Sequence, residues 1–186
     1  MKFNKKGYST IGLEKNFLSK DECDRVISKG ERAEWQELDT PQNYWYPLGS
    51  GARKVQKIRL LPDIEKRMRI SMDNFNYHSY NFKLTDGLQC FLAKYDHPTH
   101  RIGWHKDDYQ MLEDIVNKAP IYRISMSILL NDNFEGGDFE MKEHGIINTE
   151  AGAAVLFCAH DFHRVNNMIK GKRYSLNVWR HGIRSE

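Results

Sequence analysis

The sequence predicts a mainly β domain, in which two helices support a barrel or sandwich of largely antiparallel strands. Helix signals are concentrated before about residue 80. Short runs with strand composition, separated by turn residues, follow from there to the C-terminus. Aromatic residues, which favour sheets, make up 12% of the chain.

The first helix is predicted from Ser19 to about Ala33, because Ser19-Lys-Asp-Glu22 matches a capping box. Pro62 and Asp63 open the second helix. Its apolar residues recur at steps of four, four and three, as expected for one buried helix face: Ile64, Met68, Met72 and Phe75.

The second half of the chain reads as a sheet. Turn signals occur at Asp86-Gly87, at 96–98 and at 135–137. Strands are predicted at 122–130, where apolar residues alternate with Arg and Ser, at 152–158, and at 173–179.

The 186 residues fit one globular domain, and neither a repeat nor a linker divides them. We therefore expect a single domain over 1–186, with 1–79 as mostly helical support and 80–186 as the barrel core. The chain shows no signal-peptide or membrane-spanning run, and its three cysteines lack CxxC spacing. These features predict a cytoplasmic protein that has no membrane partner.

One histidine and a neighbouring aspartate have a spacing that suits metal ligands. If 102–107 is extended, His105 and Asp107 project from the same face of the strand. Asp108 is the alternative carboxylate, which we disfavour because residues three apart on a strand face opposite sides. A His-x-Asp triplet is common by chance and needs a third ligand.

His163 supplies that ligand, at the end of an apolar strand and turn, and Arg173 follows ten residues later. Two histidines and one carboxylate leave open positions for Fe(II) to bind a chelating oxoacid and dioxygen. A planar guanidinium could then pair with the far carboxylate of that acid. A zinc site built from Cys158, His160 and His163 would lack a fourth ligand.

Residues 80–179 resemble the 2-oxoglutarate/Fe(II) oxygenase superfamily, and specifically its prolyl 4-hydroxylase-like branch with its short microbial and viral members. The resemblance is carried by the following segments: Tyr95, Trp104-His105-Lys-Asp107, the strand 124–131, Glu135-Gly-Gly-Asp-Phe139, His163-Arg-Val and 171–179.

This resemblance implies a double-stranded β-helix of the jelly-roll or cupin type, with His105, Asp107 and His163 as iron ligands. It implies 2-oxoglutarate as cosubstrate, dioxygen as oxidant and ascorbate as an optional addition. Relatives in the animal oxygen-sensing group have a tyrosine where this chain has Ile128, which leaves Arg173 more of the cosubstrate binding. The implied site further includes Tyr95 and Ser175 beside the cosubstrate, and Asn177, Trp179, Ile128 and Trp104 in the pocket.

The resemblance also implies hydroxylation of an aliphatic C–H bond, in a prolyl or lysyl side chain of a peptide or protein. A free amino acid or small metabolite is the first alternative. An alkylated nucleobase is the second, encouraged by Arg173 and Arg180 but opposed by the short interval from His163 to Arg173. An inactive barrel that acts as a binding module is an alternative of another class. Residues 39–57 are a candidate flap over the site, and the oligomeric state stays open.

Overall fold

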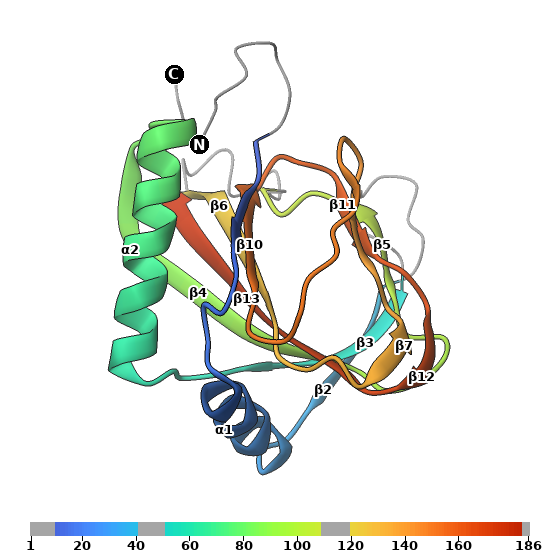
Figure 1. Ribbon diagram of the computed structural model, residues 1–186. Coiled ribbons are helices and arrows are strands. Elements are labelled where there is room, and N and C mark those ends of the chain that lie inside the picture. The colour runs from blue at the N-terminus through green and yellow to red at the C-terminus, as the bar shows by residue number, and fades with distance from the viewer. Residues whose placement is uncertain (1–9, 41–50, 109–119, 184–186) are drawn as a thin grey trace.

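The computed structural model describes residues 10–40, 51–108 and 120–183 (Figure 1). Two helices, α1 (Lys20–Glu31) and α2 (Pro62–Ser79), are accompanied by strands throughout the chain. The strands are β1 (Gly12–Glu14), β2 (Gln36–Thr40), β3 (Gly51–Lys57), β4 (Leu84–Tyr95), β5 (Ile102–His105), β6 (Ile121–Leu129), β7 (Phe134–Gly136), β8 (Phe139–Met141), β9 (Gly145–Ile146), β10 (Ala154–Cys158), β11 (His163–Val165), β12 (Met168–Gly171) and β13 (Arg173–Gly182).

The strands form a barrel from two facing sheets and a short ribbon. The main sheet has the order β1-β10-β6-β13-β4-β3-β2, the smaller sheet has the order β5-β11-β8-β9, and β12 pairs with β7. The ladders between these strands are antiparallel. Figure 1 looks into the barrel, with β5 and β11 across from β6 and β13. The mainly β, antiparallel prediction is confirmed.

Both predicted helices form where their sequence signals place them. At the start of α1, the Ser19 hydroxyl accepts from the Glu22 amide at 3.2 Å, while the Glu22 carboxylate accepts from the Ser19 amide at 2.9 Å. The capping box is therefore confirmed. The helix ends at Glu31, slightly before the predicted end at Ala33.

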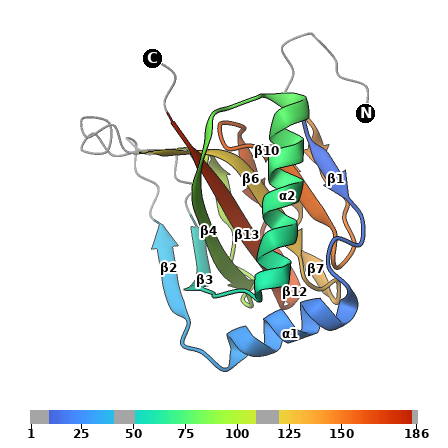
Figure 2. The same cartoon turned by 90° about the vertical axis from the view of Figure 1, so that its left-hand side faces the viewer.

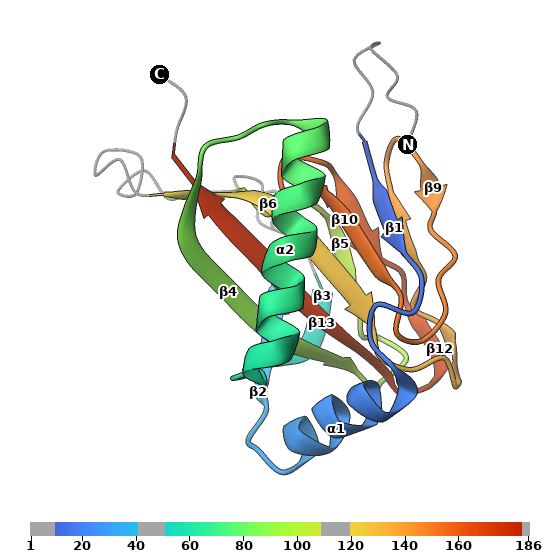
Figure 3. The ribbon, with the colours of Figure 1, turned by 60° about the vertical axis from the view of Figure 1, so that its left-hand side comes forward.

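The helices cover the outer face of the main sheet (Figures 2 and 3). Apolar residues from α1 and α2 pack there against alternate residues of the sheet strands, because successive side chains of a strand point to opposite faces. The buried partners on the sheet include Leu92, Met126, Ile128, Leu176 and Val178. The other face of these strands is thereby directed into the barrel.

Strands form at both ends of 36–57, a region predicted to be part of the mostly helical support, with a candidate flap at 39–57. β2 and β3 form a hairpin, and β3 pairs with β4, so that the main sheet is extended at this edge. The segment 41–50, which holds most of the candidate flap, lies outside the described residues. Within the described ranges, neither helix is both long and apolar enough to cross a membrane.

The turn before β10 fixes the N-terminal segment to the barrel. The Gly152 amide donates to the Leu129 carbonyl at 2.7 Å, and its carbonyl accepts from the Leu18 amide at 3.0 Å. Gly152 has φ +85, and a Cβ atom there would lie 2.2 Å from the Leu18 carbonyl oxygen. Gly145 also has a positive φ, +72, but a Cβ atom there would meet nothing within 4 Å.

These two glycines allow a matched stability test. Gly145→Ala should cost about 1 kcal/mol, the usual penalty for a side chain in the left-handed region. Gly152→Ala should cost at least roughly 3 kcal/mol, because backbone strain is joined by a clash with a fixed carbonyl. Urea unfolding measures both free energies. Equal losses in the two variants would show that the packing of Leu18 on this turn is unimportant.

Candidate metal centre

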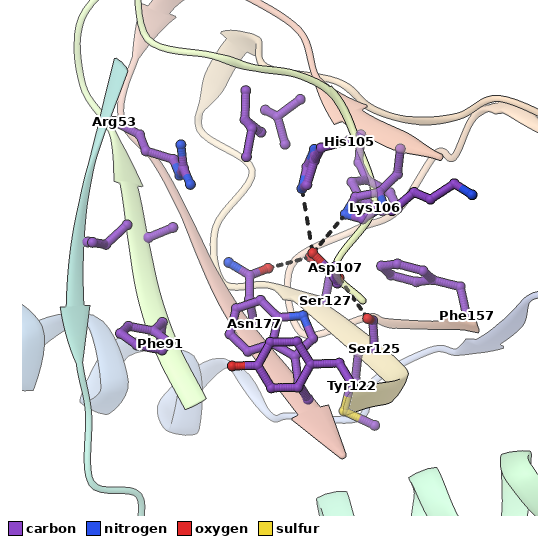
Figure 4. A pocket seen from close by; sticks show the side chains of 18 of the residues that line it. Arg53, Phe91, His105, Lys106, Asp107, Tyr122, Ser125, Ser127, Phe157 and Asn177 are labelled. Carbon is purple, nitrogen blue, oxygen red and sulfur yellow. Dashed lines mark hydrogen bonds and ion pairs between the residues drawn. The ribbon is translucent and has the colours of Figure 1, made fainter. Parts of the chain in front are cut away.

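A cavity of about 490 Å³ opens inside the barrel, between the inner faces of the two sheets. Figure 4 shows this cavity from close by. Its size lies within the range of small-molecule sites. The wall is mostly apolar and aromatic, with a few polar groups gathered on β5, β6, β11 and β13. The lining residues are Leu38, Arg53, Val55, Phe91, Ala93, Tyr95, Ile102, His105, Lys106, Asp107, Tyr122, Ser125, Met126, Ser127, Phe139, Phe157, His163, Val165, Asn177 and Trp179.

The three predicted ligands meet in this cavity. His105 at the end of β5 is the direct partner of His163 in the antiparallel ladder with β11, and their ring centroids lie 4.1 Å apart. The Nε2 atoms of both rings are 3.6 Å from Oδ1 of Asp107. The candidate ligand atoms of the three residues all lie within 4.8 Å of one another.

Hydrogen bonds fix which ring nitrogen faces the cluster. Nδ1 of His105 lies 2.9 Å from the Gly103 carbonyl oxygen, and Nδ1 of His163 lies 3.0 Å from that of Asp161. A carbonyl oxygen only accepts, so each Nδ1 carries the proton and donates. Each Nε2 therefore presents a lone pair toward Asp107, which is how metal-bound histidines are usually oriented.

Asp107 lies just beyond β5 and is held at both its backbone and its side chain. Its amide donates to the Ala159 carbonyl at 2.9 Å, which ties the residue to the loop after β10. The Ser125 hydroxyl of β6 donates to Oδ2 at 2.7 Å. Since Ser125 occupies Oδ2, Oδ1 remains directed at the two imidazoles (Figure 4).

The protonation states suit a metal. Burial raises the pKa of the Asp107 carboxyl, but the adjacent His163 and His105 and the Ser125 hydrogen bond outweigh burial and hold this pKa well below its usual range. Burial, together with the neighbouring His105, lowers the pKa of His163 to about 4, against the opposing effect of Asp107. At neutral pH the cluster thus offers a carboxylate and a neutral His163, the forms that bind metal ions.

Two imidazole nitrogens and one carboxylate oxygen would bind a metal ion from one side and leave its other coordination positions open. This ligand set fits a first-row divalent ion. The alternative ligands are engaged elsewhere. The carboxylate of Asp108 pairs with Nδ1 of His160 at 2.7 Å, and Nε2 of His160 lies 2.7 Å from the Lys106 ammonium. Within the described ranges, Cys158 and His160 therefore form no closed zinc site with His163.

Arg173 and Ser175 lie side by side on β13, as the alternation predicts. Arg173 is 3% exposed, its Nη1 donates to the Ser175 hydroxyl at 3.0 Å, and its guanidinium carbon lies 5.4 Å from the centre of the Tyr95 ring. Burial lowers the pKa of Arg173, although Tyr95 and Asp138 act in the opposite direction. Tyr95, the direct partner of Arg173 on β4, lines the cavity, whereas Arg173 and Ser175 are not among the lining residues.

The predicted pocket residues divide by strand parity. Asn177 and Trp179 line the cavity, as expected from the inward face of β13. The placement of Ile128 in the pocket is wrong, because its side chain faces the helices in the core, and Ser127 faces the cavity in its place. The placement of Trp104 in the pocket is also wrong. Trp104 is not among the lining residues, and the centre of its ring lies 4.6 Å from the guanidinium carbon of Arg164.

The sequence analysis missed Arg53, Ser125 and Ser127. The two serines belong to the alternating pattern of 122–130, which was used only to predict a strand. Their parity with respect to the apolar residues could have placed them on the site face. Arg53 lies in a segment with no recognised strand signal, so its inward position depends on pairing with β4.

Ser125 can be tested separately from the ligands. Ser125→Ala should weaken Mn(II) binding roughly 10- to 100-fold, because Asp107 loses the donor that orients it. Mn(II) affinity can be measured from the loss of the free-ion EPR signal. Ser127→Ala is the matched control, since its hydroxyl lies on the same face of β6 but donates to Asn177 at 2.9 Å. An equal loss in both variants would contradict the role assigned to Ser125.

Comparison with known proteins agrees with this geometry. The model of the 2OG-Fe(II) oxygenase superfamily matches residues 90–181, a span that includes all three candidate ligands and Arg173. No curated protein sequence matches the chain.

Solved structures of similar fold include three prolyl hydroxylases. The viral collagen prolyl hydroxylase of Paramecium Bursaria Chlorella virus-1, in its 2-oxoglutarate complex, has a TM-score of 0.68 at 12% identity, covering 93% of this chain and 96% of its own. A Pseudomonas putida prolyl-4-hydroxylase has a TM-score of 0.66 at 19% identity, with coverage of 95% and 94%.

A Trichoplax adhaerens prolyl hydroxylase, in complex with a hypoxia inducible factor peptide fragment, has a TM-score of 0.68 at 17% identity, with coverage of 92% and 83%. At these identities the likeness concerns the fold, and it confirms the double-stranded β-helix. The family match, which includes the His105, Asp107 and His163 cluster, shows that the chain belongs to the 2-oxoglutarate- and Fe(II)-dependent oxygenase superfamily.

Proposed function

We propose that the protein hydroxylates a prolyl side chain of a peptide or protein. The observation that supports this most is the combination of the His105, Asp107 and His163 cluster with an aromatic cavity wall directly beside it. Three solved structures of the same fold are prolyl hydroxylases, and one of them binds a peptide. Their low identity makes this substrate class a proposal.

In this proposal His105, Asp107 and His163 hold the iron, and Arg173 pairs with the distal carboxylate of 2-oxoglutarate. Bound iron and 2-oxoglutarate supply the oxidising chemistry, which consumes dioxygen and releases succinate and carbon dioxide. The chain orients these groups. Arg173 is preorganised for a carboxylate because Ser175 and the Tyr95 ring fix its guanidinium. Tyr95 is the direct partner of Arg173 on the neighbouring strand and lines the cavity, so the guanidinium lies beside the cavity wall.

The aromatic wall favours a prolyl over a lysyl side chain. Trp179 packs edge-on against Phe91 at 5.8 Å and stacks with Tyr122 at 5.5 Å. These rings offer an apolar surface for an aliphatic ring and exclude water from it. Asp107 is the one carboxylate among the described lining residues, and Arg53 is a cation in the same wall. A lysyl ammonium would therefore find a like charge and no free partner.

The alternatives make different demands on the cavity. A free amino acid would need a partner for its ammonium group, which the described lining lacks beyond the ligand Asp107. The nucleobase alternative loses one of its supports, because Arg180 is buried on the helix side, where it pairs with Asp73 at 3.0 Å. A barrel used only for binding does not require the oriented imidazoles and carboxylate described above.

The proposed reaction can be tested with the purified protein, Fe(II), 2-oxoglutarate and a library of prolyl, lysyl and control peptides. Prolyl peptides should stimulate succinate release and gain the mass of one oxygen atom on the prolyl residue. Mass spectrometry measures both products, and Asp107→Ala is the negative control. Oxygen added only to free amino acids or other metabolites would replace this substrate class with the first alternative.

The role of Arg173 predicts a selective binding defect. Arg173→Ala should weaken the binding of 2-oxoglutarate by at least roughly 30-fold. This factor corresponds to about 2 kcal/mol of binding free energy, lost when a buried charge pair is broken. Fe(II) affinity should stay nearly unchanged. The visible charge-transfer band of the anaerobic Fe(II) and 2-oxoglutarate complex measures binding of the cosubstrate. A Ser175→Ala variant should lose less of this binding than Arg173→Ala. Equal loss of iron and cosubstrate binding would refute the assignment.

A further inference from the structure

Arg53 is a cavity residue that the ligand and cosubstrate assignments leave unused. It lies on β3, two residues before Val55, and both side chains belong to the cavity lining. Figure 4 shows its guanidinium directed from β3 into the cavity. Its Nη1 is buried and has no hydrogen-bond partner among the residues that the structure describes. A buried guanidinium N–H without an acceptor is costly, unless a ligand supplies one.

The other charged groups of the wall are already paired. Asp107 is committed to the imidazoles and to Ser125. The Lys106 ammonium is turned outward, where it lies 2.7 Å from His160 and 4.7 Å from the centre of the Phe162 ring. Figure 4 shows the Lys106 side chain pointing away from Arg53. Arg53 is therefore the cation of the described lining that remains without a counter-charge.

Adding the cofactors does not remove this excess. Fe(II) would bring two positive charges, and Arg173 carries one. Asp107 and 2-oxoglutarate together would contribute three negative charges, which balance them. Among the described lining residues, and with the Lys106 ammonium turned outward, the loaded site would then be neutral apart from Arg53. A half-buried guanidinium with a buried Nη1, set in a mostly apolar wall, favours an opposite charge nearby. The remaining ligand is the substrate.

We infer that Arg53 binds a carboxylate of the substrate, close to the residue that is hydroxylated. This inference rests on the proposed function and specifies its substrate class as an anionic peptide segment. The carboxylate comes either from a chain terminus or from an acidic side chain next to the prolyl residue. A planar guanidinium binds a carboxylate through two parallel hydrogen bonds, which would satisfy Nη1 and fix the substrate against the aromatic wall.

The test uses binding rather than turnover. The full chain is loaded with Mn(II) and 2-oxoglutarate under argon, and small probes are titrated while their proton NMR signals are followed. Mn(II) broadens the signals of a probe that lies near the metal, so affinity and location are measured together. The probes are two acid and amide pairs: N-acetylproline with its amide, and N-acetylleucine with its amide. Ac-Asp-Pro-amide compared with Ac-Asn-Pro-amide tests the side chain as the source of the carboxylate.

The acid should bind about tenfold or more tightly than its amide, the usual effect of one charged hydrogen-bonded pair. If an acidic side chain is the source of the carboxylate, Ac-Asp-Pro-amide should bind more tightly than Ac-Asn-Pro-amide by a similar factor. Arg53→Gln should abolish the preference. Lys57→Gln, which removes the same charge from the exposed end of β3, should retain it. The Fe(II) and 2-oxoglutarate charge-transfer band should form normally in Arg53→Gln.

Each other outcome is decisive. Equal affinities within every pair, or no broadening by any probe, would overturn the inference. Loss of the charge-transfer band in Arg53→Gln would also overturn it, because Arg53 would then bind the cosubstrate. An acid preference in the leucine pair alone would support the role of Arg53 and contradict the prolyl substrate. The two proposals thus fail separately.

Discussion

The site depends on the pairing of β5 with β11, which places His105 directly opposite His163. Two imidazoles with centroids 4.1 Å apart repel each other when both are protonated. The carboxylate of Asp107 lies 3.6 Å from both Nε2 atoms and offsets that cost. A metal ion in the same place does so more completely, because it binds all three groups. The β5 and β11 register is therefore both a structural contact and the basis of the chemistry.

The main sheet supports this pairing by separating two functions onto its two faces. On β13, Leu176 and Val178 are buried against the helices, while Arg173 and Ser175 face inward. β6 has the same alternation, with Ser125 directed at Asp107. Helix packing on the outer face thus fixes the rotation of each strand. That rotation determines which polar groups reach the metal, so core packing and site geometry are set together.

The alternation rule explains how much could be predicted from the sequence. The spacing of His105 and Asp107, the apolar strand before His163 and the family resemblance predicted the cluster, and the alternation of 173–179 predicted the position of Arg173. Ile128 was misplaced because its assignment came from resemblance, although its own strand pattern puts it with the core residues. β3 has no comparable local pattern, and its position depends on a long-range ladder with β4. Long-range pairing is what a reading of local sequence patterns does not capture.

The two inward-facing arginines show why this limitation affects the substrate more than the cofactors. Arg173 is held by Ser175, on a strand whose inward face could be recognised, and by Tyr95, which the family resemblance singled out. These contacts orient the guanidinium before any ligand binds, which suits a cosubstrate that is consumed but is the same molecule in every cycle. Arg53 comes from β3, the strand next to the edge strand β2, and its Nη1 has no hydrogen-bond partner among the described residues. Inward side chains on β3 can change without disturbing the metal cluster, because none of the three candidate metal ligands lies on this strand. Specificity on this fold can therefore vary at β3, while the chemistry remains fixed at β5 and β11.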